Sequence, residues 1–372
     1  MRKILYVAPR PGEEGGIADY AAQFRSVIAE VCDYDDQLVV GGMPSRADVR
    51  QIWKDVRRDS RSGRYQDYSL VHIELAYATY REYFFAQAVR RHASVPLVLT
   101  LHEPREVVHR PYRYLNLESK PRLLRIFRRG LDDYYGRAQR KRLLNKATPI
   151  VLGPRGKRDL ESEWGISGAA VLPHVAFPGG KRHERDDAFH ILFAGFIGPH
   201  KGVETLLEAF RLLRTREHNR SIKLHIVGKD PQYGEKPLKA QLDQFGITAD
   251  VVLPGYLSEE GLMQAFCECA VAVLPYEPGL AGAASGMLMR ALSTGTPTIC
   301  SDVPSLRQDI VVGKTALEFP AGNAQALADE LLHLMRDDRL RASLGKAARA
   351  TMEQTRSATA LASQLRAIYE TA

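Results

Sequence analysis

Short apolar runs alternate with longer amphipathic stretches along the chain, and this alternation occurs twice. In the first half, the longer stretches Ile17–Val31 and Thr79–His92 have the periodicity of helices. The apolar runs between them predict strands at Lys3–Ala8, Gln37–Val40, Leu70–Glu74, Leu97–Leu101, Ile150–Leu152 and Ala170–Leu172. Strands that alternate with helices are typical of parallel sheets covered by helices.

The alternation stops between Phe177 and Asp187, where Pro-Gly-Gly and mixed charges form a stretch without periodicity. It then restarts with predicted strands at Ile191–Ala194, Leu224–Val227, Val251–Leu253, Ala272–Leu274, Thr298–Cys300 and Ala316–Phe319. The predicted helices of this half are Val203–Thr215, Ala284–Ser293 and Ala324–Met335, followed by a helical region Arg339–Ala372 with a break near Ser357.

This pattern predicts an α/β protein with two Rossmann-like, doubly wound parallel sheets. A chain of 372 residues is long enough for two such domains. We expect a first domain over residues 1–178, a second over residues 186–356, and a final helix, residues 357–372, that packs back on the first domain. In such sheets, ligands bind beyond the carboxyl ends of the strands.

Composition narrows the class of protein. Apolar residues make up 45% and charged residues 26%, which are ordinary values for a globular chain. No apolar run is long enough to span a membrane, and Met1–Pro9 is too short for a signal peptide, so we expect a cytoplasmic protein. The four cysteines lack metal-ligand spacing and are predicted to be reduced and structural: Cys32, Cys267, Cys269 and Cys300.

The positive charge is concentrated in one segment. Between Arg105 and Arg142, twelve Lys or Arg face four Asp or Glu, an excess equal to the net charge of the whole chain, +8. Apolar residues recur there at helical spacing, and the basic side chains that lie mostly on other faces are Arg122, Arg125, Arg128 and Arg129. Two interpretations stay open: a solvated helix flank, or a helix that docks on an anionic membrane. No nucleic-acid recognition motif accompanies the charge, so we expect no nucleic-acid partner.

Two features of the first half lie where ligands are expected. Gly15-Gly16-Ile17 forms a glycine-rich turn before a helix, where backbone amides suit anions or hydroxyls. Its spacing does not fit the dinucleotide fingerprint, and a plain tight turn explains it equally well. His102 follows a strand and could contact a sugar or be an ordinary loop residue, whereas His72 and Glu74 share one strand face. Asp33-Tyr34-Asp35 precedes a strand and is predicted to be a solvated loop away from the ligand side.

The second half carries a richer set of turns. After the strand Ile191–Ala194 comes Gly195-Phe196, and then Lys201-Gly202 at the start of a helix. A lysine there combines a cation with free amides, as a diphosphate requires, although a solvated lysine is equally compatible. Val227-Gly228 and Gly255-Tyr256-Leu257 end the next two strands, where glycine permits close approach of a ligand.

A second helix start follows later in the same half. Pro275-Tyr276-Glu277 precedes a loop of small residues, which leads into Ser285-Gly286-Met287-Leu288 and a helix that ends before Gly295-Thr296-Pro297. Backbone amides at this start would face the same ligand side of the sheet.

The ordered set of these motifs resembles glycosyltransferase family 4, which has the GT-B fold, over nearly the whole chain. The resemblance implies two domains that face each other across a cleft, the second binding a nucleotide sugar and the first binding the acceptor. It further implies transfer with retention of anomeric configuration and without an essential metal or other cofactor. By this resemblance, Lys201 would neutralise the diphosphate, Ser285–Leu288 would offer amides to it, Tyr256 and Leu257 would flank the base, and His102 would contact the sugar. The same likeness places Gly16, Ile17, Gly195, Phe196 and Gly228 around the donor.

The sequence departs from this family at three positions. The family has two glutamates eight positions apart where this chain has Gly282 and Arg290, and it often has an arginine where this chain has Phe196. Glu277 is a candidate to replace the missing carboxylates. The phosphate-facing motifs are retained, so we expect activity to be retained.

Three hypotheses follow for the function. The favoured one is a transferase that moves a sugar from a UDP- or GDP-sugar to a glycan or lipid-linked acceptor. The reaction would serve the synthesis of cell-surface polysaccharide or glycoconjugate. Peripheral attachment to the inner face of the cell membrane is part of this hypothesis. The transferase hypothesis explains the duplicated architecture and the ordered motifs together. A sugar-nucleotide or carbohydrate binding protein without catalysis is the alternative that the missing glutamates favour. A nicotinamide-dependent oxidoreductase is the third, and the absence of an acidic residue at Val40-Gly41-Gly42 argues against it.

Overall fold

The computed structural model describes residues 3–11, 15–39, 44–75, 80–109, 136–198, 200–229, 236–279 and 284–372. The chain divides into two compact units. The N-terminal unit contains the chain up to Val175 together with Ala284 and the returning segment Ser357–Ala372. The C-terminal unit contains Ala176–Leu280 and Ser285–Arg356.

The N-terminal unit is built on a six-stranded parallel sheet with the order β2-β1-β3-β4-β5-β6. Its strands are β1 Ile4–Pro9, β2 Tyr34–Val39, β3 Val71–Leu75, β4 Leu97–Leu101, β5 Thr148–Val151 and β6 Ala170–Val171. Its helices are α1 Gly16–Ala29, α2 Arg46–Arg61, α3 Arg81–His92, α4 Pro104–His109, α6 Pro154–Trp164 and α14 Ala358–Thr371.

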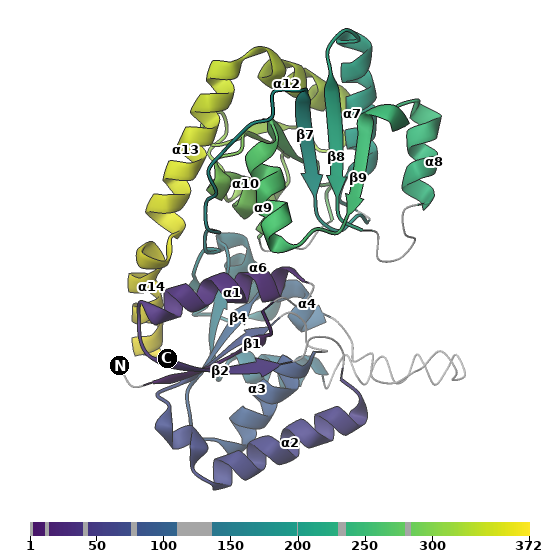
Figure 1. Ribbon diagram of the computed structural model, residues 1–372. Coiled ribbons are helices and arrows are strands. Elements are labelled where there is room, and N and C mark those ends of the chain that lie inside the picture. Colours follow the sequence, from purple (N-terminus) through teal and green to yellow (C-terminus); the bar gives the residue numbers. More distant parts are fainter. Residues whose placement is uncertain are drawn as a thin grey trace, which may run out of the picture. The chain divides into compact units, whose positions relative to one another are not determined.

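Side chains of the central strands alternate between two apolar cores, one on each face of this sheet. Along β1, Leu5 and Val7 enter the core that includes residues of α2 and α3, whereas Ile4 and Tyr6 enter the core that includes α1 and α14. Figure 1 shows α1 and α14 lying side by side, although they come from opposite ends of the chain. The last helix is therefore part of the N-terminal core.

The C-terminal unit repeats the design with the strand order β12-β11-β10-β7-β8-β9, all pairs parallel. Its strands are β7 Phe189–Ala194, β8 Ile222–Val227, β9 Val251–Gly255, β10 Val271–Leu274, β11 Thr298–Ser301 and β12 Leu317–Phe319. Its helices are α7 Val203–Arg216, α8 Lys236–Phe245, α9 Glu259–Glu268, α10 Gly286–Thr294, α11 Pro304–Arg307, α12 Ala324–Arg336 and α13 Asp338–Arg356. The strand order reverses between β7 and β10, so the fold has its topological switch point there.

Two parallel α/β sheets confirm the predicted fold class, and most predicted strands lie within two residues of the observed ones. The predicted helix break is also observed, because the hydroxyl of Ser357 accepts a hydrogen bond from Ala360 N and caps α14. One prediction is wrong. Tyr34 and Asp35 belong to β2 rather than to a solvated loop, and Asp35 pairs with Lys3 and accepts a hydrogen bond from Tyr68. β2 is an edge strand, so these polar side chains reach solvent without breaking the sheet.

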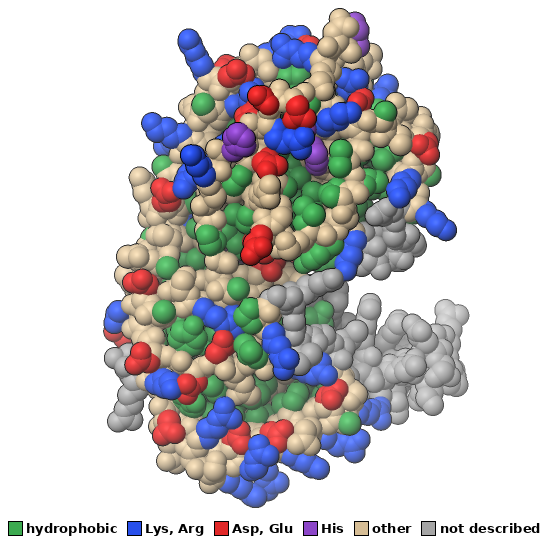
Figure 2. Space-filling view, viewed as in Figure 1, with side chains coloured by type: hydrophobic (Ala, Val, Ile, Leu, Met, Phe, Trp, Pro, Cys, Tyr) green, Lys and Arg blue, Asp and Glu red, His purple; other side chains and the backbone are tan. Residues whose placement is uncertain are grey.

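Charge is also prominent on α2, which the periodicity analysis did not predict. Six exposed cations lie on this helix, and Figure 2 shows blue side chains gathered over it; they are Arg46, Arg50, Lys54, Arg57, Arg58 and Arg61. The predicted basic helix with Arg122, Arg125, Arg128 and Arg129 lies outside the described residues. Among the helices that are described, none is long and apolar enough to cross a membrane. The four cysteines are all free thiols.

Candidate functional site

Glycines join the ends of three adjacent strands in the C-terminal unit. Gly195 follows β7, Gly228 follows β8 and Gly255 ends β9, with φ of 135°, 136° and 75°. Gly195 N donates to the carbonyl of Val227 (3.0 Å), and Gly228 N donates to that of Gly255 (2.8 Å). A Cβ on Gly228 would lie 1.8 Å from the Gly195 carbonyl oxygen. The strand ends therefore meet backbone to backbone, and this carboxyl edge presents little side-chain bulk to a ligand.

The start of α10 borders the same edge. A Cβ on Gly195 would lie 3.7 Å from Met287 Cγ, so the first strand end touches the helix start. Met287 and Leu257, which follows β9, pack against one apolar cluster beneath the edge. The glycine edge thus runs from the α10 start at one end to the Tyr256-Leu257 loop at the other.

The loop that carries Lys201 is fixed to the segment after β10. His200 and Gly202 adopt positive φ (66° and 67°), and a Cβ on Gly202 would lie 1.7 Å from the carbonyl oxygen of Pro275. Glu277 N donates to the His200 carbonyl at 2.9 Å. Only glycine fits at position 202, and the contact fixes the path of the backbone on either side of Lys201.

Tyr276 links Lys201 to the start of α10. Lys201 Nζ lies 3.9 Å from the centre of the Tyr276 ring, and Tyr276 Oη shares a 3.2 Å hydrogen bond with Ser285 Oγ. Ser285 Oγ accepts from Leu288 N at 3.3 Å and so caps the helix. The amides that this helix start can offer to an anion are therefore those of Gly286 and Met287, because neither has an intrahelical acceptor. Tyr276 thus bridges an ammonium and a helix N-terminus, two kinds of group that bind phosphate.

Aromatic residues that follow two of these glycines, Phe196 after Gly195 and Tyr256 after Gly255, are exposed. Phe196 is 42% and Tyr256 48% exposed, large values for apolar side chains, and Lys229 Nζ lies 5.3 Å from the centre of the Tyr256 ring. Exposed aromatic rings beside open backbone are suited to stacking on a planar ligand group. These positions agree with the expected order of the motifs along the sheet edge; their predicted contacts with a donor stay predictions.

The N-terminal unit places His102 in a buried hydrogen-bonded cluster. His102 Nε2 lies 2.7 Å from Glu74 Oε2, and Tyr6 Oη donates to Glu74 Oε1 at 2.9 Å. In the tautomer that carries its proton on Nε2, the His102 ring donates to Glu74, and its Nδ1 is then an acceptor. The ring of Tyr20 from α1 stands edge-on to His102, with 4.7 Å between ring centroids. The sequence indicated His102 and Glu74 separately and the structure brings them together, whereas their contacts with Tyr6 and Tyr20 were not predicted.

His72 belongs to the same cluster but not to its open side. Its ring nitrogens lie 2.6 Å from Tyr369 Oη and 2.7 Å from Thr100 Oγ1. Burial lowers the pKa of His72 to about 4, and the nearby Glu74 only partly offsets this effect. His72 is therefore neutral and structural. Gly16 and Ile17 begin α1 in this unit, as predicted, after Gly15 with a φ of 149°.

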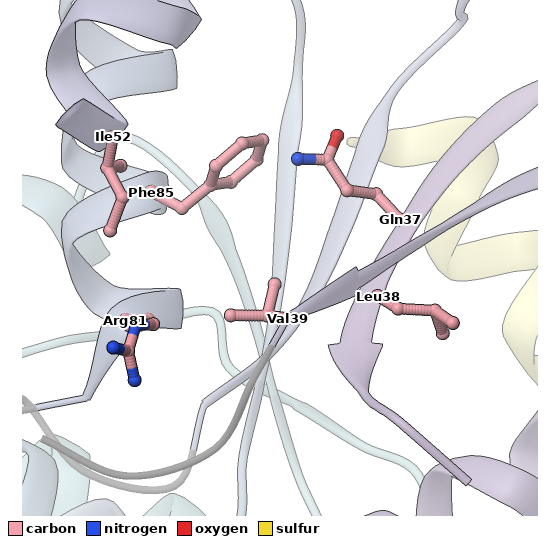
Figure 3. A pocket seen from close by; sticks show the side chains of 6 residues that line it. All are labelled: Gln37, Leu38, Val39, Ile52, Arg81 and Phe85. Atoms are coloured by element: carbon pink, nitrogen blue, oxygen red, sulfur yellow. The ribbon is translucent and has the colours of Figure 1, made fainter. Parts of the chain in front are cut away.

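A small pocket in the N-terminal unit is lined by none of these motif residues. It has a volume of about 270 Å³ and opens beside the edge strand β2, between α2 and α3. Figure 3 shows the residues that line it: Gln37, Leu38, Val39, Ile52, Arg81 and Phe85. The Arg81 guanidinium is paired with Asp48 at 3.1 Å, so the pocket wall is mainly apolar and differs in character from the amide-rich edge of the C-terminal unit.

Comparison with known proteins identifies the C-terminal region. A family model described as glycosyl transferases group 1 matches residues 180–351, which include every motif along the glycine edge. Residues 180–351 are thus similar to the glycosyl transferases group 1 family. This finding confirms the resemblance that the ordered motifs predicted.

The group 1 match is accompanied by similarity to individual proteins. A phosphatidyl-myo-inositol mannosyltransferase of Mycobacterium leprae is 31% identical over 183 residues, which cover 49% of this chain and 46% of that protein. The D-inositol 3-phosphate glycosyltransferases that also match are likewise aligned over less than half of their length.

Solved structures establish the fold over the full chain. Sucrose-phosphate synthase from Thermosynechococcus elongatus matches 100% of this chain and 99% of its own with a TM-score of 0.69 at 19% identity. Anabaena HepE in complex with UDP matches 100% of both chains with a TM-score of 0.68 at 14% identity. These similarities place the chain in the two-domain GT-B fold.

Proposed function

We propose that this protein is a metal-independent, retaining glycosyltransferase that moves a sugar from a UDP- or GDP-sugar to a glycan or lipid-linked acceptor. The observation that carries the proposal is the linkage Lys201–Tyr276–Ser285, which joins an ammonium to a helix start beside an open glycine edge. It lies inside the region that is similar to the group 1 family. HepE has the same fold and has been solved in complex with UDP and with UDP-glucose, which supports such a donor.

The chemistry required at this site is stabilisation of a leaving diphosphate. As the bond between the sugar and the diphosphate breaks, negative charge grows on the phosphate oxygens. Lys201 and the amides of Gly286 and Met287 are positioned to receive that charge, and the loss of one such donor typically costs about 3 kcal/mol of transition-state stabilisation. The contact with the Tyr276 ring restricts the ammonium before the donor arrives, so little ordering is left for the reaction itself.

The contact that we propose with the transferring sugar rests on His102. We propose that its Nε2 donates to Glu74 and that its Nδ1 accepts a hydrogen bond from a hydroxyl of that sugar. Both oxygens of Glu74 are engaged, one by Tyr6 and one by His102, which disfavours Glu74 as a covalent nucleophile. We therefore propose front-face attack, in which the donor phosphate takes the proton of the acceptor hydroxyl.

A decisive experiment measures binding and product with the intact chain. Calorimetry against UDP, GDP and their common sugar conjugates, with EDTA present, should show one base bound and retained affinity without metal. Incubation of that donor with glycan and lipid-linked acceptors, followed by NMR of the product, should show the anomeric configuration of the donor. Silence across the nucleotide panel, or an inverted product, would reject the proposal.

A non-catalytic binding protein is the second candidate. It is favoured by Gly282 and Arg290 at the positions of the family glutamates, since neither side chain accepts sugar hydroxyls as a carboxylate would. This candidate predicts nucleotide-sugar affinity without turnover against any acceptor. We propose Glu277 as the carboxylate that supports turnover instead, because it is half-buried and its backbone N donates at 2.9 Å to the carbonyl of His200, the neighbour of Lys201. Unchanged kinetics in Glu277→Gln would exclude that role.

The cellular setting of the proposed reaction is the cytoplasmic face of the cell membrane, in the synthesis of cell-surface polysaccharide or glycoconjugate. The basic composition of the segment Arg105–Arg142 supports attachment to anionic lipid. Sedimentation of the full chain with vesicles containing phosphatidylglycerol, compared with phosphatidylcholine alone, tests this placement.

A further inference from the structure

Arg290, which stands where the family has a glutamate, is a fully buried cation. It lies on α10, is 0% exposed, and has the ring of Phe177 3.9 Å from its guanidinium carbon. Its Nη1 donates to the carbonyl of Gly286 at 3.3 Å, so it also contacts the first turn of its own helix. A buried guanidinium requires an anionic partner.

That partner is Glu259, the first residue of α9. Arg290 Nε donates to Glu259 Oε1 at 3.0 Å and Nη2 donates to Oε2 at 2.6 Å, which is a bidentate ion pair. The Glu259 side chain is 38% exposed although its partner is fully buried. Each carboxylate oxygen has a second lone pair, and those lone pairs can accept from a ligand on the open side.

The position of this carboxylate is informative. α9 begins directly after Tyr256-Leu257, at the aromatic end of the glycine edge. Arg290 joins Glu259 to α10, whose start is the proposed phosphate end. A nucleotide has its ribose between base and phosphate, so a ligand that spans the two ends brings its ribose to the gap that this ion pair bridges. A rigidly held carboxylate with free lone pairs is suited to accept from the two adjacent hydroxyls of a ribose.

We propose that Glu259, held by Arg290, binds the ribose hydroxyls of the donor nucleotide and selects ribonucleotides over deoxyribonucleotides. This inference rests on the proposed function, because it assigns a residue to the same donor. Arg290 is a positioning residue in this scheme, since it is buried and acts through the carboxylate that it orients.

The first test needs no substitution. Calorimetry of the wild-type chain compares UDP with 2′-deoxy-UDP, and GDP with 2′-deoxy-GDP. Loss of a hydrogen bond to a charged group is expected to weaken binding of the deoxy compound about tenfold. Equal affinity for a ribonucleotide and its deoxy counterpart overturns the inference, while the proposed function stands. Absence of binding to every one of the four nucleotides means that the proposed function itself has failed.

The second test uses a matched pair of variants. Glu259→Gln should bring the ratio of ribo to deoxy affinity close to one, because the carboxylate is lost. Glu260→Gln changes the same charge in the same helical turn at an exposed position, and it should keep the wild-type ratio. A ratio that survives Glu259→Gln, or that falls equally in both variants, overturns the inference.

Removal of Glu259 alone leaves a buried guanidinium without its anion, which can impair folding. The double variant Glu259→Gln with Arg290→Met removes the cation as well. It is expected to bind the ribonucleotide and its deoxy counterpart with similar affinity, and discrimination that persists in it contradicts the role of Glu259.

Discussion

The two units carry similar sheets, but they use their polar groups in opposite ways at the carboxyl ends of the strands. In the described part of the N-terminal unit, Glu74 near the end of β3 is 0% exposed, His102 after β4 is 8% exposed, and the two are hydrogen-bonded to each other. In the C-terminal unit, the corresponding edge presents glycines, exposed aromatic rings and a helix start. Related architectures can therefore direct polar groups either inward, where they stabilise the fold, or outward, where they are left for a ligand.

This difference gives the two edges different sensitivities. Substitutions in the N-terminal cluster should change the free energy of unfolding, whereas side-chain substitutions along the C-terminal edge should change ligand affinity. Both tryptophans, Trp53 and Trp164, lie in the N-terminal unit. Tryptophan fluorescence therefore reports unfolding of the N-terminal unit, and nucleotide affinity reports the state of the C-terminal unit.

Gly228→Ala should have the largest effect. The added Cβ would lie 1.8 Å from the Gly195 carbonyl oxygen at a φ of 136°, so backbone must move. We expect the C-terminal unit to lose about 4 kcal/mol of stability and nucleotide binding to be abolished. Circular dichroism should show early unfolding while the tryptophan transition stays unchanged. Gly198→Ala is the control, since a Cβ there meets nothing within 4 Å; equal damage in both variants would contradict the packing argument.

The second largest effect should be a loss of stability of the N-terminal unit when the pH is lowered. His72 has a pKa of about 4 in the folded chain, compared with an ordinary value of 6.5, because burial disfavours its charged form. Below pH 6.5 the unfolded chain binds this proton and the folded chain does not. Stability from this group is thus fully present above pH 6.5 and is lost as the pH falls towards 4, by about 3 kcal/mol in total.

Denaturant unfolding followed by tryptophan fluorescence at pH 7 and pH 5 measures this effect. His72→Gln should reduce the loss of stability between the two pH values by roughly 2 kcal/mol, whatever its effect at pH 7. His218→Gln, at an exposed position, should leave the pH dependence as it is in the wild type. A His72→Gln variant with the wild-type pH dependence would show that His72 is not held neutral.

Lys201→Met should cause the smallest change in free energy, and that change should be confined to nucleotide binding. Loss of the ammonium should weaken nucleoside diphosphate binding by about 2 kcal/mol, or roughly thirtyfold, because one charged contact is removed. Calorimetry measures this loss, and both unfolding transitions should stay near their wild-type positions. Lys314→Met, an exposed lysine of the same unit, should bind normally. Weaker binding in both variants would indicate a general effect of charge and not a specific site.

The alternation of apolar runs was sufficient to predict the fold, because buried parallel strands are short, continuous and apolar. β4 lies at Leu97–Leu101 as predicted, and α14 begins after Ser357 as predicted. The helix α2 was missed because its sequence is dominated by arginine, with Val56 its one buried residue among those described. Asp35 was misplaced because an edge strand tolerates polar residues that an alternation pattern excludes.

The site was predicted in part. Motifs that are continuous in sequence, such as Lys201-Gly202 and Ser285-Gly286, could be recognised from spacing alone. Contacts between side chains that are distant in sequence could not be predicted in this way. Glu259 and Arg290 are 31 residues apart, and His72 and Tyr369 are 297 residues apart. Such pairs are created by the packing of helices on a sheet, and no local pattern encodes them.

The hydrogen bond between His72 and Tyr369 has a consequence for biogenesis. While the polypeptide is still on the ribosome, β3 exists long before the helix that covers His72. At ordinary translation rates the interval is roughly 15 to 60 s, during which the nascent first unit has an uncovered apolar face against which α14 will later pack. The need for chaperones should therefore persist until α14 has been synthesised.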